Sequence, residues 1–315
     1  MENVLTTTFV TGLLASSFSL AIPLLLATLG EVFVERSGLL NMGIEGMILM
    51  GCFVSYIGAV YGGGVMMGIV ASIVMGVLIG LLMALLTLKM HANQSICGIV
   101  FNFFATGATG FFNRYIMGVS LIPTTVETLQ PLPIPFLSDI PIVGFLFNQN
   151  IMAYLTVILV PIAAFLLFRT NLGLKIRAVG GNAQAADTMG IDVIKIRSWM
   201  WIVGAVLACL AGAYLTLTIG LFSDGMSNNR GFIAIALVVF ARWMPWNALL
   251  GAFVFGFADA LQLRLQALSL GIPYQFLVML PYVLTIIVLI IGASSKYVNP
   301  SVVAVPYVRE GKELN

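Results

Sequence analysis

Long apolar runs constrain this chain more than any other feature. A membrane-spanning helix needs about 20 mostly apolar residues, and several stretches approach or reach that length. They are residues 11–30, 66–88, 95–112, 151–168, 199–221, 248–262 and 274–292. Hydrophobic residues make up 60% of the chain and charged residues only 8%, an apolar share beyond that of soluble domains. The sequence therefore predicts an all-α integral membrane protein.

Two further apolar segments complete the predicted bundle. They cover residues 41–60 and 231–243, and the second is short for a full crossing. We expect one domain over residues 1–315, a polytopic helical bundle of about eight to ten membrane segments. Broken or re-entrant helices are compatible with this count. Residues 11–30 are read as a retained first helix, because no Lys or Arg precedes them as in a signal peptide.

The orientation follows from the positions of the cations. Residues 169–197 contain Arg169, Lys175, Arg177, Lys195 and Arg197, so this segment is expected in the cytoplasm. Counting crossings from there puts residues 118–150 outside, and that connection contains no Lys or Arg. The same count puts the N-terminus outside and the C-terminus inside, with Lys296, Arg309 and Lys312 in the cytoplasmic tail.

Residues 172–197 form a polar island between apolar runs and predict a short cytoplasmic helix. Asn182 is a suitable N-cap, residues 183–189 are mostly good helix formers, and Gly190 stands where a left-handed C-cap belongs. A compact capped helix in the cytoplasm indicates a contact with a partner. The alternative is an ordinary connecting loop.

The external connection, residues 118–150, is rich in proline and is therefore expected to be stiff and non-helical. Two readings are open. The segment is a loop that covers the bundle, or it is a docking rim for an extracytoplasmic partner.

Polar side chains inside the predicted spans are candidates for contact with a solute, because they are costly at bilayer depth. Asn41 and Glu45 are four residues apart and share a helix face, and Asn102 lies among aromatic residues. With Asp259 in residues 248–262, the candidate pathway is Asn41, Glu45, Asn102, Phe101, Phe104 and Asp259. The alternative for each polar residue is packing within the bundle. Arg264 is expected to neutralise Asp259, and Glu31, Glu35 and Arg36 are expected to form an ion cluster.

Two glycine-bearing polar entries, residues 37–46 and 225–231, each lead into an apolar segment. The predicted topology gives the two units opposite directions across the membrane. This favours an inverted internal repeat with a solute path between its halves.

Three motifs carry a resemblance to a known family. They are ERSGLLNMGIEGMILMG (residues 35–51), GLKIRAVGGNAQAADTMGI (residues 173–191) and RGFIAIALVVFARWMPWNALLGAFVFGFADALQLRLQ (residues 230–266). In this order they resemble the permease subunits of bacterial ABC importers, and more narrowly the nucleoside-type branch of the branched-chain amino acid and ribose permease superfamily. The resemblance covers residues 35–290.

The resemblance implies a permease of the bacterial cell membrane that moves nucleosides, purine nucleosides first, or alternatively a sugar such as ribose or galactose. It implies that the island contacts a cytoplasmic ATPase through Arg177, Asn182, Ala183, Gln184, Ala185, Ala186, Asp187, Met189 and Gly190. It further implies a second homologous permease, in a heterodimer, and a substrate-binding lipoprotein outside near residues 118–150.

Other function classes have less support in the sequence. No GxxxxGK[ST] phosphate loop occurs, so ATP and Mg²⁺ are assigned to the partner ATPase and no cofactor to this chain. Cys52, Cys97 and Cys209 show no metal-type spacing, no nucleophile–base pair is apparent, and no basic patch suggests nucleic acid. An ion-coupled secondary transporter remains the alternative, and it would need no helix of the island type.

Overall fold

The computed structural model describes residues 7–118, 124–135, 138, 144–267, 273–293 and 307. Lys296, Arg309, Lys312 and Asp139 lie outside the described residues. The helices are α1 (Thr7–Arg36), α2 (Ile44–Gly62), α3 (Val65–Ala84), the π-helical turn η2 (Leu85–Lys89), α4 (Gln94–Met117), the 3₁₀ turn η3 (Gly144–Phe147), α5 (Ile151–Arg169), α6 (Asn171–Gly181), α7 (Ala183–Thr188), α8 (Val193–Ile219), α9 (Arg230–Phe240), α10 (Pro245–Ala267) and α11 (Tyr274–Ala293).

The predicted all-α membrane class is confirmed. Seven of the described helices are long and apolar enough to cross a membrane, namely α1, α2, α3 with η2, α4, α5, α8 and α10. The helix α9 is a shorter apolar helix, as the segment at residues 231–243 predicted, and α11 is a further apolar helix of 20 residues. Strands β1 (Pro131–Pro133) and β2 (Asn148–Asn150) form a small antiparallel pair.

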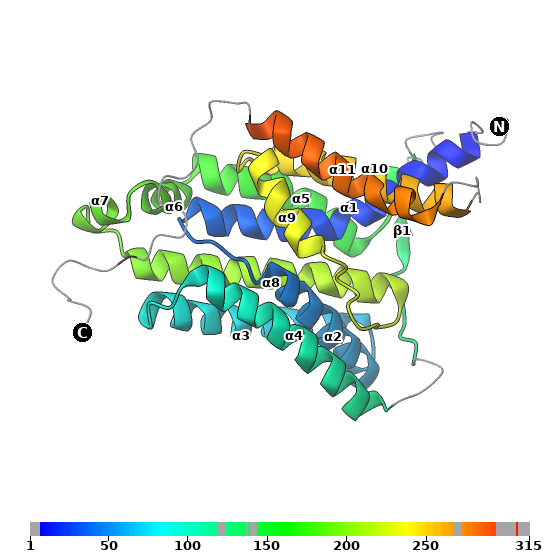
Figure 1. Cartoon of the computed structure of the whole chain (residues 1–315), viewed down its shortest axis with the longest axis horizontal. Helices are drawn as coiled ribbons and strands as arrows, with labels where there is room; N and C mark the ends of the chain where they lie inside the picture. The colour runs from blue at the N-terminus through cyan, green and yellow to red at the C-terminus, as the bar shows by residue number, and fades with distance from the viewer. Residues whose placement is uncertain are drawn as a thin grey trace.

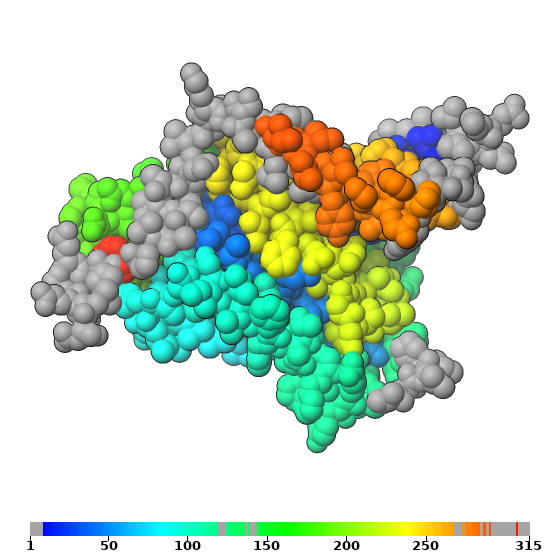
Figure 2. All heavy atoms as spheres, viewed as in Figure 1, coloured from blue at the N-terminus to red at the C-terminus, as the bar shows by residue number. Residues whose placement is uncertain are grey.

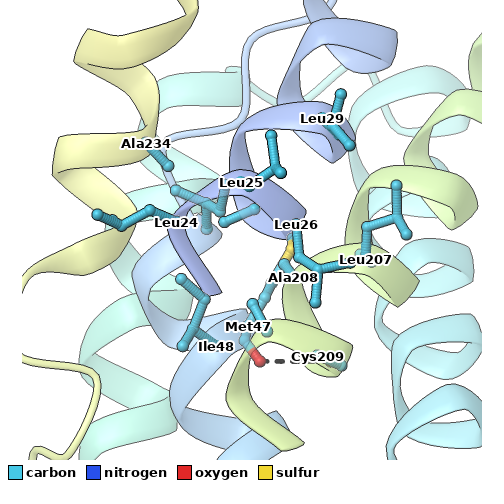
Figure 3. Packing of buried hydrophobic residues seen from close by; sticks show 14 of the residues in the cluster. Leu24, Leu25, Leu26, Leu29, Met47, Ile48, Leu207, Ala208, Cys209 and Ala234 are labelled. Carbon is cyan, nitrogen blue, oxygen red and sulfur yellow. Dashed lines mark hydrogen bonds between the residues drawn. The ribbon is translucent and has the colours of Figure 1, made fainter. Parts of the chain in front are cut away.

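Helices α1, α2 and α8 form the centre of the bundle (Figure 1). Leucines of α1 pack against Met47 and Ile48 of α2 and against Leu207 and Ala208 of α8, and Cys209 donates to the Met47 carbonyl oxygen at 3.3 Å (Figure 3). Glycine brings α2 and α8 into backbone contact: a methyl group at Gly212 would overlap the backbone of α2 at Ile48. Small residues allow this approach in membrane bundles.

The island folds into more than the one short helix predicted. The helix at residues 183–189 is present as α7, and Gly190 adopts the expected left-handed conformation with φ of 79°. Residues 171–181 form α6 in addition, because the Thr170 hydroxyl accepts from Gly173 N and starts a helix there. α8 follows after the N-cap Asp192. α6 and α7 extend beyond one end of the bundle (Figure 1).

The cations assigned to the cytoplasm gather at this end. Arg36 at the end of α1 and Arg177 of α6 lie over the same Phe168 ring, at 5.4 and 5.3 Å from its centroid. Arg36 also donates to the carbonyl oxygens of Arg242 and Trp243 between α9 and α10. We call this the cytoplasmic end, after the orientation predicted from the sequence.

The external connection reaches over the opposite end. Val126 N and Leu129 N donate to the carbonyl oxygens of Gly220 and Leu217 at the end of α8, each at 2.8 Å. Tyr56 of α2 donates to the Thr124 carbonyl oxygen at 2.6 Å. Its residues 124–129 therefore cover the outer ends of α2 and α8.

The contacts between helices show a repeated pattern when α1–α4 are matched in order with α8–α11. α1 packs on α10 as α8 packs on α3, α2 packs on α8 as α9 packs on α1, and α2 contacts α4 as α9 contacts α11. α2 runs away from the cytoplasmic end and α9 runs toward it (Figure 1). This is the contact pattern expected when α1–α4 and α8–α11 are inverted repeats.

Candidate functional site

Two breaks in helical structure meet inside the bundle. α2 starts at Ile44 after a non-helical segment, and α9 starts at Arg230 after residues 220–229, both part-way along the bundle (Figure 1). The Glu45 carboxylate joins the two helix starts, because it accepts from Asn229 N at 2.9 Å and from Gly231 N at 2.7 Å. A carboxylate at a helix N-terminus satisfies free N–H groups and complements the helix dipole. Glu45 therefore acts as the N-terminal cap of a neighbouring helix.

Asn102 of α4 holds the break before α2. Its Oδ1 accepts from Gly46 N at 2.8 Å and its Nδ2 donates to the Met42 carbonyl oxygen at 2.8 Å. Both ends of the amide are thus engaged with backbone that has no partner in a regular helix. These contacts agree with the alternative that Asn102 serves packing within the bundle. The residue also lines a pocket.

Asn41 is fully buried and turns the chain before α2. Its Oδ1 accepts from Gly43 N at 3.0 Å, its Nδ2 donates to Met47 Sδ at 3.4 Å, and its backbone N donates to Glu31 Oε1 at 3.2 Å. The structure therefore separates Asn41 from Glu45 and Asn102, since it does not line their pocket.

A pocket of about 370 Å³ opens where the two helix starts face α4. We call it the inner pocket. It is lined by Glu45, Leu49, Ile99, Asn102, Phe103, Thr106, Gly225, Ser227, Asn228, Asn229 and Phe232. Among these described lining residues Glu45 alone is ionisable, and its carboxylate is already hydrogen-bonded to α9. The inner pocket thus offers amides, hydroxyls, two aromatic rings and one carboxylate, which is held by the start of α9.

The two candidate phenylalanines, Phe101 and Phe104, lie outside the inner pocket. Phe101 is buried in the core and Phe104 is exposed elsewhere on α4, and neither lines the inner pocket. Phe103 lines it from α4 and is 75% exposed, while Phe232 lines it from α9. Of the three phenylalanines around Asn102, Phe103 is the one on the face of α4 that lines the inner pocket.

A second pocket, of about 600 Å³, continues from the inner pocket toward the outer end and shares Thr106 and Gly225 with it. Arg114 of α4 and Asp224 form an exposed ion pair at 3.1 Å in its lining. The two pockets follow α4, which lies on the surface beside α9, and the surface is hollowed between them (Figure 2). Together they form a groove along an open face of the chain.

The remaining predicted charges take other partners. Asp259 of α10 does not line the inner pocket, and it interacts electrostatically with Arg230. Arg264 instead donates to the Phe9 carbonyl oxygen and lies over the Phe9 ring. The expected neutralisation of Asp259 by Arg264 is therefore wrong.

The expected ion cluster of Glu31, Glu35 and Arg36 is also wrong. Glu31 accepts from Asn41 N, and Glu35 accepts from the Trp243 indole Nε1. Arg36 donates to backbone carbonyl groups. Burial of these side chains favours such fixed polar partners, although Glu31 Oε2 has no hydrogen-bond partner among the described residues.

At the cytoplasmic end, α7 presents one face to the protein and one to the solvent. Asn182 Oδ1 accepts from Ala185 N at 3.0 Å and caps the helix as predicted. Ala183 and Ala186 are buried, whereas Gln184 and Ala185 are exposed and Asp187 is half-buried. Met189 just beyond the helix is 82% exposed. Arg177 is half-buried against Phe168, so it connects α6 to α5 rather than facing outward.

Sequence reasoning left several pocket residues out of its candidate set. Asn228 and Asn229 belong to a polar entry that the sequence did single out, and both adopt positive φ, 47° and 60°, a conformation that Asn tolerates better than most residues. Phe103 was noted only as a neighbour of Asn102, and Thr106 and Phe232 carried no signal of their own. These residues come together because α4 and α9 line opposite sides of the pocket.

Comparison with known proteins gives one family match. The model of the family described as branched-chain amino acid transport system permease component matches residues 13–291. The guanosine ABC transporter permease NupQ of Bacillus subtilis is 35% identical, over 92% of this chain and 94% of that protein. The nucleoside ABC transporter permease NupC of Lactococcus lactis is 32% identical, over 91% and 93%.

A third relative carries a different solute in its name. TsgC13 of Haloferax volcanii, provisionally named as a glucose ABC transporter permease, is 39% identical over 84% of this chain and 80% of that protein. No solved structure matches the chain.

Proposed function

This chain belongs to the branched-chain amino acid transport system permease family, and from that membership we propose that it moves nucleosides through the inner pocket. The chain is a multi-pass membrane subunit of an ABC transporter and not an enzyme. Members of this family work with an ATPase and a substrate-binding protein. The solute, its path and the identity of the individual partners are what we propose.

The observation that carries the nucleoside assignment is the composition of the inner pocket. Phe103 and Phe232 supply flat apolar surfaces, and stacking of a base on an aromatic ring contributes about 1–3 kcal/mol. The amides of Asn228 and Asn229 supply donors and acceptors for base edges or ribose hydroxyls. The one carboxylate of the pocket is held by α9, and the other lining groups are uncharged, which suits a solute that is neutral overall, as nucleosides are. NupQ and NupC, related over most of their length, carry guanosine and nucleoside in their names.

A sugar is the second candidate, favoured by the relationship to TsgC13. The same amides and the Thr106 hydroxyl could bind sugar hydroxyls. The two candidate solutes differ in their expected contact with Phe103 and Phe232, because a purine base stacks on the full face of an aromatic ring whereas a sugar covers less of it.

We further assign the ATPase contact to the exposed side of α7 and to Met189. In this arrangement the partner ATPase binds ATP and Mg²⁺ and supplies the energy for transport. α7 is suited to transmit a displacement into the bundle, because α6 connects it to Phe168 and Arg36 at the cytoplasmic end.

A second permease chain is proposed to close the groove along α4. Phe103, Phe111 and Tyr115 of α4 are 75, 64 and 78% exposed, on the side where the pockets open. A solute path that is open along its length would leak into lipid unless another chain covered it. We propose a homologous partner in a heterodimer, and a substrate-binding lipoprotein that docks on the external connection.

Ligand-dependent stability of the purified permease–ATPase complex, without the binding protein, tests the solute. At a concentration about tenfold above a weak dissociation constant, a bound solute stabilises the complex by roughly 1.4 kcal/mol. We expect guanosine and adenosine to raise the apparent Tm, and ribose and glucose to leave it unchanged. Phe103→Leu should remove the rise, whereas Phe104→Leu, the matched control outside the pocket, should keep it. A rise with glucose or ribose alone would assign the transporter to sugars.

A further inference from the structure

Residue Tyr307, near the C-terminus of the chain, lies against the cytoplasmic helices although it is far from them in sequence. Its side chain packs on a small apolar cluster that is separate from the main core of the bundle. The buried members of this cluster are Val179 of α6, Ala183 and Ala186 of α7 and Val193 of α8, and we call it the coupling core. Ile191 and Ile196 pack at its edge. Tyr307 therefore contacts the cluster that joins α6, α7 and α8.

The coupling core has little apolar area without this ring. Two of its four buried residues are alanines, and α7 has only six residues. A helix of six residues has no stability of its own in water and depends on tertiary contacts. The Tyr307 ring adds a large apolar surface to these contacts. We infer that the ring is needed to keep α7 in a fixed position on α6 and α8.

Tyr307 also connects the coupling core to the backbone break before α2. Its side chain lies near Arg197 of α8, whose side chain is fully buried. Arg197 Nε donates to the Ser37 carbonyl oxygen at 3.2 Å. Ser37 begins the segment that leads to Asn41 and Glu45, and Gly180 of α6 packs directly on the backbone of residues 36–38. Arg197 and Gly180 thus lie between the coupling core and the segment before α2.

We propose that Tyr307 is a positioning residue of the coupling apparatus, which fixes α7 relative to Arg197 and the segment before α2. The proposal rests on the assignment of α7 as the ATPase contact. With Tyr307 in place, displacement of α7 moves α6, the start of α8 and residues 36–38 together. Without it, α7 moves alone and less of the displacement reaches the inner pocket.

Replacement of Tyr307 tests the proposal in the assembled transporter. We expect Tyr307→Ala to leave assembly with the ATPase intact and to lower the ratio of solute imported to ATP hydrolysed about fivefold or more, the lower range of coupling between two sites. Tyr307→Phe keeps the ring and should retain most of the ratio. Tyr282→Ala, which removes an exposed tyrosine of α11, is the matched control and should match the wild type.

The ratio separates positioning from a merely structural role. If Tyr307→Ala lowered only the amount of complex, and uptake fell in proportion with an unchanged ratio, the positioning role would be wrong. An unchanged ratio with normal assembly would also overturn it. If a variant that breaks α7 itself transported normally, the ATPase assignment would fail instead, so the two failures are distinguishable.

The position of Tyr307 is tested separately by thiol labelling of the assembled transporter. Cys52 and Cys209 are buried and Cys97 is half-buried, so Cys97→Ser gives a background of low reactivity. In this background we expect a maleimide to label Tyr307→Cys much more slowly than Met189→Cys, which replaces an 82% exposed side chain. Equal labelling rates would show that Tyr307 does not lie on the coupling core.

Discussion

Replacing Ala185 with proline should abolish ATP-driven uptake while the chain still inserts into the membrane. Ala185 N donates to the Asn182 cap at 3.0 Å, and proline has no N–H to donate. Loss of a capping bond costs about 1 kcal/mol. Proline also pushes the preceding residue, Gln184, out of the α region. In a helix of six residues these two effects remove most of the regular hydrogen bonding, and the face of α7 that should meet the ATPase is lost.

The measurement is uptake of labelled nucleoside together with ATPase recovery in pull-down of the permease. Asn171→Pro is the matched control, because it stands at the first position of α6, where proline is tolerated and the preceding Thr170 is already extended. The control should transport normally. Normal uptake by Ala185→Pro would show that α7 is an ordinary loop element and not the coupling helix.

The second large effect is expected at Glu45. Glu45→Ala leaves the N–H groups of Asn229 and Gly231 at the start of α9 without their acceptor, and loss of a helix-capping hydrogen bond costs about 1 kcal/mol. The start of α9 should then lose its position against α2, and the inner pocket should lose its shape. We expect uptake to disappear and the apparent Tm of the purified complex to fall.

Glu45→Gln separates charge from geometry at the same site. The glutamine side chain keeps one carbonyl acceptor, so the fall in Tm should be smaller, about 1 kcal/mol in stability from the lost charge at the helix N-terminus. Glu127→Gln, an exposed carboxylate on the external connection, is the control for Tm and should leave it unchanged. If Glu45→Ala had wild-type Tm and uptake, the bridge between α2 and α9 would not be required for transport.

Local patterns predicted the parts of this fold that local chemistry determines. Apolar runs of spanning length gave the long helices, and Asn182 and Gly190 marked the ends of α7. Cations gather at one end of the bundle, and the position of that end in the cytoplasm stays a prediction. α6 was missed, because its hydrophobic positions are few and its start depends on the Thr170 cap. The breaks before α2 and α9 were indicated by glycine and asparagine at residues 37–46 and 225–231.

The candidate site was predicted less completely, because it depends on contacts between distant segments. Glu45 was identified as an unusual carboxylate, but its partners Asn229 and Gly231 follow only from the position of α9. The same applies to Phe103, which lies beside two equally plausible phenylalanines. Asn41 and Asn102 were selected for polarity, and the structure shows that their side chains bind the protein's own backbone.

Nucleoside uptake into proteoliposomes tests the central claim most directly. The complex would contain this chain, its proposed permease partner, the ATPase and the binding protein, with ATP supplied on the ATPase side. We predict that uptake requires ATP and the binding protein, continues when ionophores collapse the ion gradients, and stops when the second permease is omitted. Uptake without ATP that disappears with ionophores would contradict the account and indicate a secondary transporter. Full uptake with this chain as the only permease would contradict the heterodimer.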